Sequence, residues 1–274
     1  MSQSLEHPTF NNLVSTLLTR PFMDLPHEPM RNLVSVSTTV RIAQTMGLHC
    51  EWMWSALDPV AREMRRRVWW HIVWLDVQSS VSTGLPLCCG SEIRETVSMI
   101  AGTRDEEIKN LSASSSPPAE SLTPGESVAM LYAVGRFETA RLESIIVTRL
   151  QSEQGLTHEG FRELLTATKQ LHQKIDSLIA RIPTRGIPEK GFIPSSLANA
   201  SPVTHPSFYK DDASQPTVFA AWTRIMLTLL KSEVAILLQK PFLQPPDCKN
   251  QQAQKSWTRY VMFDSACCIS FILL

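Results

Sequence analysis

The stretch from Arg62 to Pro86, REMRRRVWWHIVWLDVQSSVSTGLP, constrains the fold of this chain more than any other. Successive side chains on a helix are about 100° apart. From Val68 onward, apolar side chains would cover nearly the whole circumference, and only His71, Gln78 and Ser82 share a narrow polar strip. A helix that is apolar nearly all round is buried. We therefore predict a central helix entered from a basic, solvated end, with a tryptophan-rich core made of Trp69, Trp70, Trp74 and Trp222.

The rest of the chain has helical periodicity between proline-rich breaks and no strand-like alternation, which predicts an all-α, bundle-like domain. Asp58-Pro59 is a strong helix start, and Gly47 and Gly84 are expected helix ends. Thr123 to Glu126 resembles a capping box. We expect one domain over 1–274, with a proline-rich linker or lid over 183–215, and helices near 10–20, 30–46, 59–82, 126–153, 158–182, 217–239 and 250–274.

The charge balance disfavours a dedicated nucleic-acid-binding domain. The 274 residues contain 26 Lys plus Arg and 26 Asp plus Glu, whereas such domains are usually basic. No apolar run approaches the about 18 residues that span a bilayer, and no signal peptide pattern is visible. We also find no nucleophile elbow, glycine-rich phosphate loop or metal-ligand pair, so we do not expect an enzyme.

The six cysteines do not have the spacing of a metal site. There is no C-x-x-C, and two pairs are directly adjacent, namely Cys88-Cys89 and Cys267-Cys268. Adjacent cysteines are poorly placed to share a metal ion. We expect reduced thiols that are mostly buried, and no metal or other cofactor in this chain.

Asp76 is a single carboxylate among the apolar residues of the central helix. A buried carboxylate needs a partner, and we expect an ion pair with Arg41 of the preceding helix. The alternative is an acid/base or ligand-binding group. No second catalytic side chain lies nearby in the sequence, so we favour the ion pair.

Three consecutive arginines, Arg65, Arg66 and Arg67, begin the same helix. One alternative is a phosphate-binding patch or a localisation signal. Consecutive residues on one helical turn point in different directions, so they make a poor single anion site. We therefore expect these arginines to pair with acidic residues on neighbouring helices.

The polar strip of the central helix is a candidate contact for a small apolar effector. A cavity with apolar walls and few polar groups is typical of small-molecule sites. We place this site between the central helix and the 217–239 helix, beneath 183–215, with His71, Gln78, Ser82 and Trp222 as contacts. The alternative is that the strip faces solvent and the segment is a tether.

The arginine–tryptophan stretch resembles the signature of the fungal-specific transcription factor domain, the middle homology region of many zinc-cluster regulators. The matching residues are Glu63, Arg65, Arg66, Arg67, Trp69, Trp70, Asp76, Ser80, Gly84 and Pro86, with Leu85 where the family has arginine. The segment TTVRIAQTMGLHCE is similar to the family's alanine-rich helix, with Arg41 matching. The segment KSEVAILLQKPFL is similar to its Arg-Pro-Phe helix, with lysine for arginine.

This resemblance implies an all-α regulatory domain of a nuclear transcription factor, with other transcription regulators or coactivators as partners. In the family, zinc and DNA are bound by a separate N-terminal cysteine cluster, and nothing before Cys50 supplies one. We therefore expect no direct DNA binding by this chain, and a fragment or shortened relative of a longer regulator. The alternative is a free-standing ligand-binding or interaction module that does not act at DNA, in the cytoplasm.

Overall fold

The regular elements of the described residues are all helices, which confirms the all-α prediction. The computed structural model describes residues 9–23, 29–104, 107–108, 126–152, 156–183 and 218–239. Within these ranges the only extended pairing is an isolated antiparallel bridge between Thr103 and Glu126. The helices are α2 (Phe10–Met23), α3 (Pro29–Thr45), the 3-10 helix η1 (Glu51–Trp54), α4 (Pro59–Thr83), α5 (Ser91–Arg94), α6 (Val128–Leu150), α7 (His158–Arg181) and α8 (Val218–Gln239).

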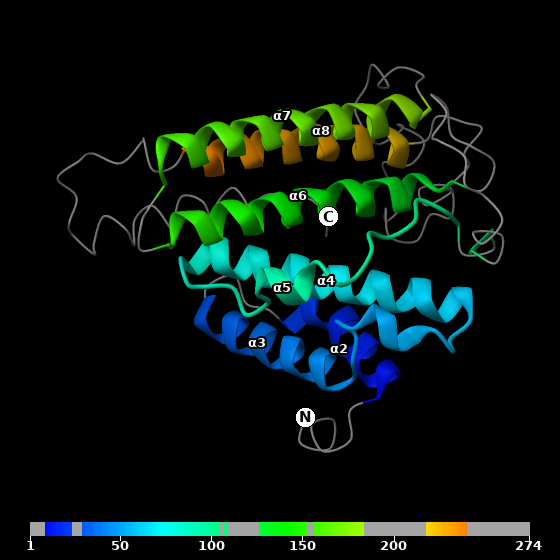
Figure 1. Ribbon diagram of the computed structural model, residues 1–274. Coiled ribbons are helices and arrows are strands. Elements are labelled where there is room, and N and C mark those ends of the chain that lie inside the picture. The colour runs from blue at the N-terminus through cyan, green and yellow to red at the C-terminus, as the bar shows by residue number, and fades with distance from the viewer. Residues whose placement is uncertain are drawn as a thin grey trace.

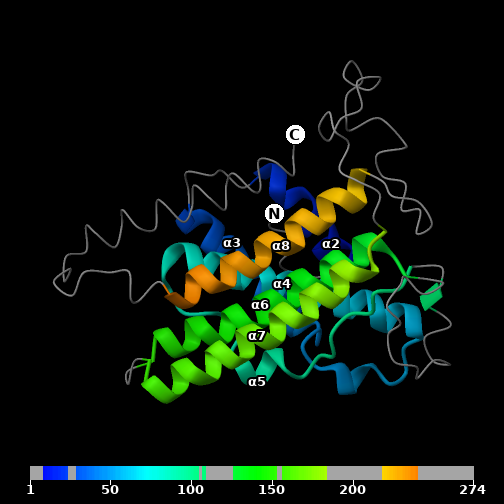
Figure 2. The same cartoon turned by 90° about the horizontal axis from the view of Figure 1, so that it is seen from above.

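The helices are stacked in layers (Figure 1). α7 and α8 lie side by side, α6 lies beneath them, α4 and the short α5 follow, and α3 and α2 form the outer layer. Figure 2 shows the same stack from above, with α6 and α7 next to each other and α8 beside them. α4 and α8 each pack against α6, so α6 is the central connection between the two ends of the stack.

The long helices around α6 have a defined direction. α4 and α6 run parallel, because His71 contacts Arg136 and, two turns later, Gln78 contacts Glu143. The ion pairs between α6 and α7 join the end of one helix to the start of the other, so those two helices are antiparallel. Because α4 and α6 run in the same direction, the segment of chain that connects them must run back along the bundle.

The predicted start and end of the central helix and the predicted end of the helix before it are confirmed. The Asp58 side chain accepts a hydrogen bond from the Ala61 N–H at 2.6 Å, and Pro59 is the first helical residue. α4 ends at Gly84, which has a φ of 74°, and Gly47 follows α3 with a φ of 67°. Only glycine adopts such left-handed geometry without strain, so these two positions fix where the chain turns.

Two helix boundaries differ from the prediction. α2 was expected to end before Pro21 but continues to Met23. A proline so near the end of a helix removes only one backbone hydrogen bond, so it does not stop the last turn.

The predicted capping box at the start of α6 is wrong. Glu126 lies in extended backbone, bridged to Thr103, so it is outside the helix. Ser127 is the N-cap instead, and its hydroxyl accepts from the Met130 N–H at 3.4 Å. The extended pairing delays the helix by one turn relative to the sequence pattern.

The core is centred on α4. Trp69 is fully buried and Trp70 is 1% exposed, which confirms them as core residues. Trp74 is half-buried and packs against this core, and Trp222 is half-buried as well, so the predicted place in the core is confirmed only in part for these two. The Arg136 guanidinium lies over the Trp74 ring, and the Trp222 ring stacks on Phe219.

Two predicted segments fall almost entirely outside the described residues: the 183–215 linker or lid, of which only Pro183 is described, and the 250–274 helix. Within the described ranges, no helix combines the length and apolar character needed to cross a bilayer.

Candidate functional site

The three consecutive arginines of α4 point in different directions, as their spacing predicts. The Arg65 guanidinium lies over the rings of Phe10 and Trp54, at 5.7 and 5.9 Å from the ring centroids. Such cation–π contacts hold the basic start of α4 against α2 and η1. Arg65 therefore makes aromatic contacts, and the expectation that it pairs with an acidic residue is not met by these contacts.

Arg66 and Arg67 are held by carboxylates. The expected ion pair with a neighbouring helix is confirmed for Arg66, whereas the ion pair of Arg67 with Glu63 lies within α4. Arg66 pairs with Glu51 of η1 and, at 3.4 Å, with Glu63. The Arg67 Nε lies 3.2 Å from Glu63, and its Nη2 donates to the Thr103 carbonyl at 3.0 Å. Glu63 is on α4 itself, one turn before its partners, so the pairing is partly within the helix.

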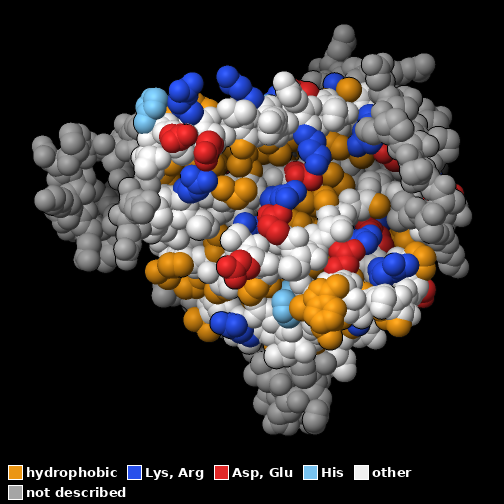
Figure 3. All heavy atoms as spheres, viewed as in Figure 1, with side chains coloured by type: hydrophobic (Ala, Val, Ile, Leu, Met, Phe, Trp, Pro, Cys, Tyr) orange, Lys and Arg blue, Asp and Glu red, His pale blue; other side chains and the backbone are white. Residues whose placement is uncertain are grey.

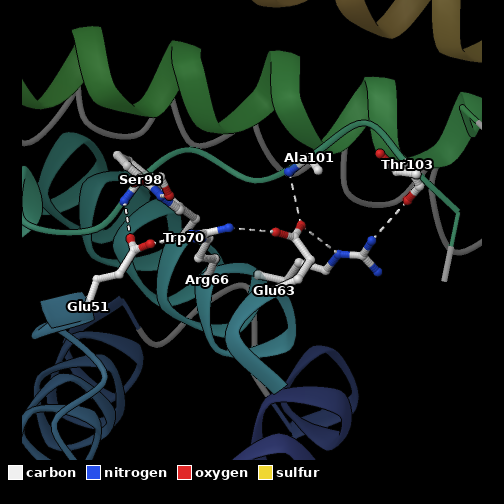
Figure 4. Close-up of polar contacts among 8 residues, drawn as sticks. Glu51, Glu63, Arg66, Trp70, Ser98, Ala101 and Thr103 are labelled. Carbon is white, nitrogen blue, oxygen red and sulfur yellow. Dashed lines mark hydrogen bonds and ion pairs between the residues drawn. The ribbon is translucent and has the colours of Figure 1, made fainter. Parts of the chain in front are cut away.

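The same carboxylates fasten the loop that crosses α4 (Figure 4). Glu51 accepts from the Ser98 N–H at 2.6 Å, and the fully buried Glu63 accepts from the Ala101 N–H at 2.9 Å. The Trp70 indole N–H donates to the Ser98 carbonyl at 2.9 Å. Burial would raise the pKa of Glu51, but Arg66 and the Ser98 N–H outweigh it and hold that pKa below its ordinary value. Arginines, tryptophan and loop form one connected network.

The predicted ion pair between Asp76 and Arg41 is wrong. The Asp76 carboxylate accepts hydrogen bonds from the backbone N–H groups of Cys88 and Cys89, at 3.1 and 2.8 Å. Arg41 is exposed and donates to Gln44 on its own helix at 3.1 Å. Burial raises the pKa of Asp76, and the two N–H donors offset this only in part.

The end of the signature shapes a turn. The Ser80 hydroxyl donates to the Leu85 carbonyl, and the Gly84 N–H donates to the Ser80 carbonyl at 2.8 Å. Gln151, just after α6, donates to the Gly84 carbonyl at 3.1 Å. Pro86 continues this exposed turn, which directs the chain back toward Asp76. Leu85, where the family has arginine, has a side chain that is 40% exposed.

The polar strip of α4 faces α6 rather than open solvent. His71 Nδ1 lies 3.3 Å from the Arg136 Nη2, and the His71 ring stacks on Trp74. Since a guanidinium only donates, this nitrogen of His71 is the acceptor. Ser82 donates to the Ser79 carbonyl within α4 at 3.0 Å, so it caps its own helix.

Gln78 lies among two buried carboxylates. Its amide donates to Glu143 of α6 at 3.2 Å, and Glu233 of α8 is also hydrogen-bonded to it. Burial, and then the charge of Glu233, raise the pKa of Glu143 well above its ordinary value. Burial also raises the pKa of Glu233, against the hydrogen bond from Gln78. A neutral carboxyl group is therefore favoured where α4, α6 and α8 meet.

Trp222 belongs to an aromatic group between α6 and α8. Its ring makes an edge contact with Tyr132 of α6 and stacks on Phe219 of α8, at centroid distances of 5.2 and 5.7 Å. Tyr132 is one turn before Arg136, which contacts His71. Of the four predicted ligand contacts, His71 and Trp222 are thus linked through α6, whereas Gln78 and Ser82 are engaged elsewhere.

Sequence reasoning missed Arg136 and Glu143 as site residues. They are charged residues seven positions apart, and this spacing puts them on one face of α6. A charged side chain within the apolar stripe of this helix was the sequence signal that could have identified both residues.

No metal centre is seen in the described part of the chain. No group of three or more His, Cys, Asp or Glu side chains gathers there in a metal-binding arrangement. The described cysteines, Cys50, Cys88 and Cys89, are free thiols.

Comparison with known proteins assigns these features to one family of sequences. A model described as the fungal specific transcription factor domain matches residues 31–176. Transcription factor macR from Penicillium terrestre is 67% identical over 258 residues, which cover 94% of this chain and 30% of that protein. Transcription factor yanR from Aspergillus niger is 57% identical over 220 residues, or 80% of this chain and 26% of that protein.

A shorter match covers part of the aurofusarin cluster transcription factor aurR2 from Gibberella zeae. It is 45% identical over 58 residues, which cover 21% of this chain and 8% of that protein. The chain thus spans 30% or less of the length of these curated relatives. No solved structure matches the chain.

Proposed function

We propose, from the premise that this chain belongs to the family of fungal specific transcription factor domains, that it is the regulatory region of a transcription factor and not an enzyme. The observation that carries this proposal is the position of the family match. Residues 31–176 run from α3 to within two turns of the end of α7, and they contain the whole network of Glu51, Glu63, Arg66 and Trp70. The family signature therefore coincides with the contacts that join η1, α4 and the crossing loop.

The geometry supports a regulatory role because the signature residues connect elements and leave few reactive groups free. Asp76 is saturated by two backbone N–H groups, and Glu63 is surrounded by two arginines and a backbone donor. Such a network makes α4 and its neighbours move as one body. A change at one side of the stack would then be transmitted across α4, which is what a regulatory domain requires.

We further propose a nuclear location, with other transcription regulators or coactivators as protein partners and a small effector as a possible ligand. The names of the relatives, which are all transcription factors, support the nuclear location. The alternative of a module unrelated to DNA has no comparable support. We also propose that zinc and DNA are not bound by this chain itself.

A gene deletion in the fungus that encodes the chain tests this function. We expect deletion to change the transcript levels of a defined set of genes and the wild-type gene to restore them. Reintroduced Glu63→Ala should fail to restore them, because it removes the buried centre of the network. Glu163→Ala is the control, since Glu163 is exposed and pairs only with the exposed Arg149.

Transcript levels that do not change on deletion, under conditions where the protein is produced, would contradict the proposal. A tagged copy measures protein abundance, so loss of regulation can be separated from loss of the protein. The same tag reports the location of the protein by microscopy.

A further inference from the structure

Arg136 is a guanidinium in aromatic surroundings. It lies on α6, between α4 and α8, and stacks 4.4 Å from the ring centroid of Trp74. The rings of Phe137 and Tyr132 lie at 5.1 and 5.7 Å. Its Nη2 donates to His71 Nδ1 at 3.3 Å, and no other hydrogen bond of Arg136 is seen among the described residues. Aromatic faces attract a cation, but they do not replace the hydrogen bonds it loses on leaving water.

No carboxylate balances this charge among the described residues. The Arg136 Nε is buried and has no hydrogen-bond partner there. The nearest acidic residues along α6 are already engaged, since Glu138 pairs with Lys174 at 2.5 Å and Glu143 is bound by Gln78. Burial lowers the pKa of Arg136, which is the expected effect of removing a cation from water without an anion. An arginine in this state is complementary to an anion.

The walls beside Arg136 are apolar and aromatic. Trp74 of α4 lies on one side, and on the other Tyr132 leads to Trp222 of α8. These three rings are half-buried, so part of each ring is accessible. α4 and α8 both pack on α6. Trp74 and Tyr132 contact Arg136 directly, and Trp222 extends this aromatic surface through its contact with Tyr132. A ligand that fits these surroundings has a flat apolar body and one anionic group.

We propose that Arg136 binds the carboxylate of a small molecule whose flat apolar body packs on Trp74, Tyr132 and Trp222. Arginine suits a carboxylate because its planar fork donates two parallel hydrogen bonds. Arg136 thus replaces Gln78 and Ser82 as the polar contact of the ligand site that was expected from the sequence. This assignment rests on the contacts of Arg136 and not on the proposed function in transcription.

Calorimetric titration of the full 274-residue chain with cinnamate and with cinnamamide tests the charge requirement. The two probes share a flat apolar body and differ in charge. We expect cinnamate to bind at least about tenfold more tightly, because charge-assisted hydrogen bonds are the strong ones. Equal affinity for both probes, or no binding of cinnamate, would overturn the proposal.

Substitutions locate the binding. Arg136→Met keeps side-chain length and removes the charge, so cinnamate should lose about tenfold in affinity and cinnamamide should not. Arg149→Met is the matched control on the same helix, because Arg149 is exposed and pairs with exposed Glu163. Arg136→Lys keeps the charge but not the fork, and it should bind cinnamate with intermediate affinity. Cinnamate affinity that is unchanged by Arg136→Met would place the site elsewhere.

Thermal unfolding without ligand distinguishes a free ligand from an acidic residue of this chain. If a carboxylate of the chain already holds Arg136, Arg136→Met leaves that carboxylate buried and alone, and Tm falls by several degrees relative to Arg149→Met. If the site is reserved for a ligand, Arg136→Met leaves Tm unchanged or raises it. A large fall in Tm for Arg136→Met, together with equal binding of cinnamate and cinnamamide by the wild type, would show that a carboxylate of the chain holds Arg136. That outcome would overturn the proposal.

Discussion

Asp76 illustrates, at the scale of single residues, that a buried carboxylate does not need a cation. Its two oxygens each accept one hydrogen bond from consecutive backbone N–H groups, those of Cys88 and Cys89. Each oxygen lies in line with one donor because the turn at Gly84 brings the chain back over α4. Asp76 therefore fixes the return of the chain, which is a structural role for a residue of the family signature.

We predict that Asp76→Ala lowers the free energy of unfolding by about 2–4 kcal/mol, because two buried N–H groups lose their acceptors. Asp76→Asn keeps one acceptor oxygen and should cost about 1–2 kcal/mol. Urea unfolding followed by circular dichroism measures both. Arg41→Ala is the control and should change stability by less than about 0.5 kcal/mol, since Arg41 is exposed. A loss for Arg41→Ala as large as that for Asp76→Ala would restore the ion pair.

The burial of single residues could be predicted from the sequence, but their partners could not. Helical periodicity placed Trp69, Trp70 and Asp76 inside, and all three are buried. The partner of Asp76 is a loop twelve and thirteen residues later, and no local pattern encodes the path of that loop. Periodicity describes the direction of a side chain from its own helix, not what meets it there.

At the scale of helices, capping residues bounded α4 correctly but failed at the start of α6, and short elements were missed. Asp58-Pro59 and Gly84 bound α4 as predicted, because each residue satisfies backbone groups that the helix itself leaves unpaired. η1 and α5 each have four residues, so they are too short to show a helical period. Both help to form the loop network around α4, and this part of the candidate site was therefore hidden from the sequence.

α6 and α8 approach closely at a glycine. A methyl group added to the buried Gly135 of α6 would lie 2.3 Å from Leu227 Cδ2 of α8 and 3.4 Å from Leu178 Cδ1 of α7. Leu227 is fully buried, so its side chain has little room to move away. Gly135 thus sets the distance between α6 and α8, in addition to lowering helix propensity.

We predict that Gly135→Ala lowers the free energy of unfolding by about 1–3 kcal/mol through overpacking. This loss should exceed the about 1 kcal/mol that alanine gains in helix propensity. Chemical denaturation measures it, and a double-mutant cycle gives the cause. If Gly135 and Leu227 collide, Leu227→Ala should cost less in the Gly135→Ala background than in the wild type. Additive effects of the two substitutions would exclude the collision.

The three parallel helices α4, α6 and α8 share a pair of buried carboxyl groups. The pKa of Glu143 is raised by burial and by Glu233, so the folded protein retains a proton that the unfolded chain has already released. Stability from this group is therefore complete below the ordinary pKa of glutamate and is lost as pH rises through the raised pKa.

We predict that Glu143→Gln abolishes this loss, because glutamine stays neutral at every pH. The variant should match the wild type at acid pH and exceed its free energy of unfolding by about 1–3 kcal/mol at neutral pH and above. Urea unfolding at a series of pH values measures the difference. Glu163→Gln, at an exposed ion pair, is the control and should show no such dependence. A Glu143→Gln curve parallel to that of the wild type would refute the prediction.

At the scale of the whole molecule, acidic and basic side chains, which are equal in number, form ion pairs between the layers of helices. On the face shown in Figure 3, side chains of both charges lie next to one another, with apolar side chains between them. Ion pairs connect neighbouring elements in the described part of the chain, including Lys174–Glu138, Lys231–Asp176, Arg181–Glu126 and Arg66–Glu51. The neutral composition therefore reflects charges paired with each other rather than a surface prepared for nucleic acid.

The all-α class and most helix positions could be predicted from the sequence, whereas the order of the layers could not. Apolar stripes show that a helix such as α4 or α8 is buried, but any two stripes can pack together. That α4 and α8 both pack on α6 depends on shape, as at Gly135 and Leu227, and on pairs such as Gln78–Glu143. Such contacts join residues far apart in sequence.

The last prediction concerns zinc and DNA. We expect the purified 274-residue chain to contain no stoichiometric zinc and to bind no specific DNA sequence. Zinc binds thiolates, usually in C-x-x-C pairs, which this chain lacks. Cys88 Sγ lies 3.2 Å from the Ser37 hydroxyl, and burial, then the charge of Asp76, raise the pKa of Cys89, which opposes thiolate formation.

Elemental analysis after incubation with zinc and dialysis tests the first part, and a mobility-shift assay at several salt concentrations tests the second. Any binding to DNA should fall steeply as salt increases and should be the same for unrelated sequences, because only phosphate contacts would contribute. Because the net charge of the chain is zero, its electrostatic attraction to the DNA phosphates is weak even for this nonspecific binding. One zinc ion per chain whose removal by a chelator lowers Tm would contradict the first part, and a sequence-specific complex at physiological salt would contradict the second.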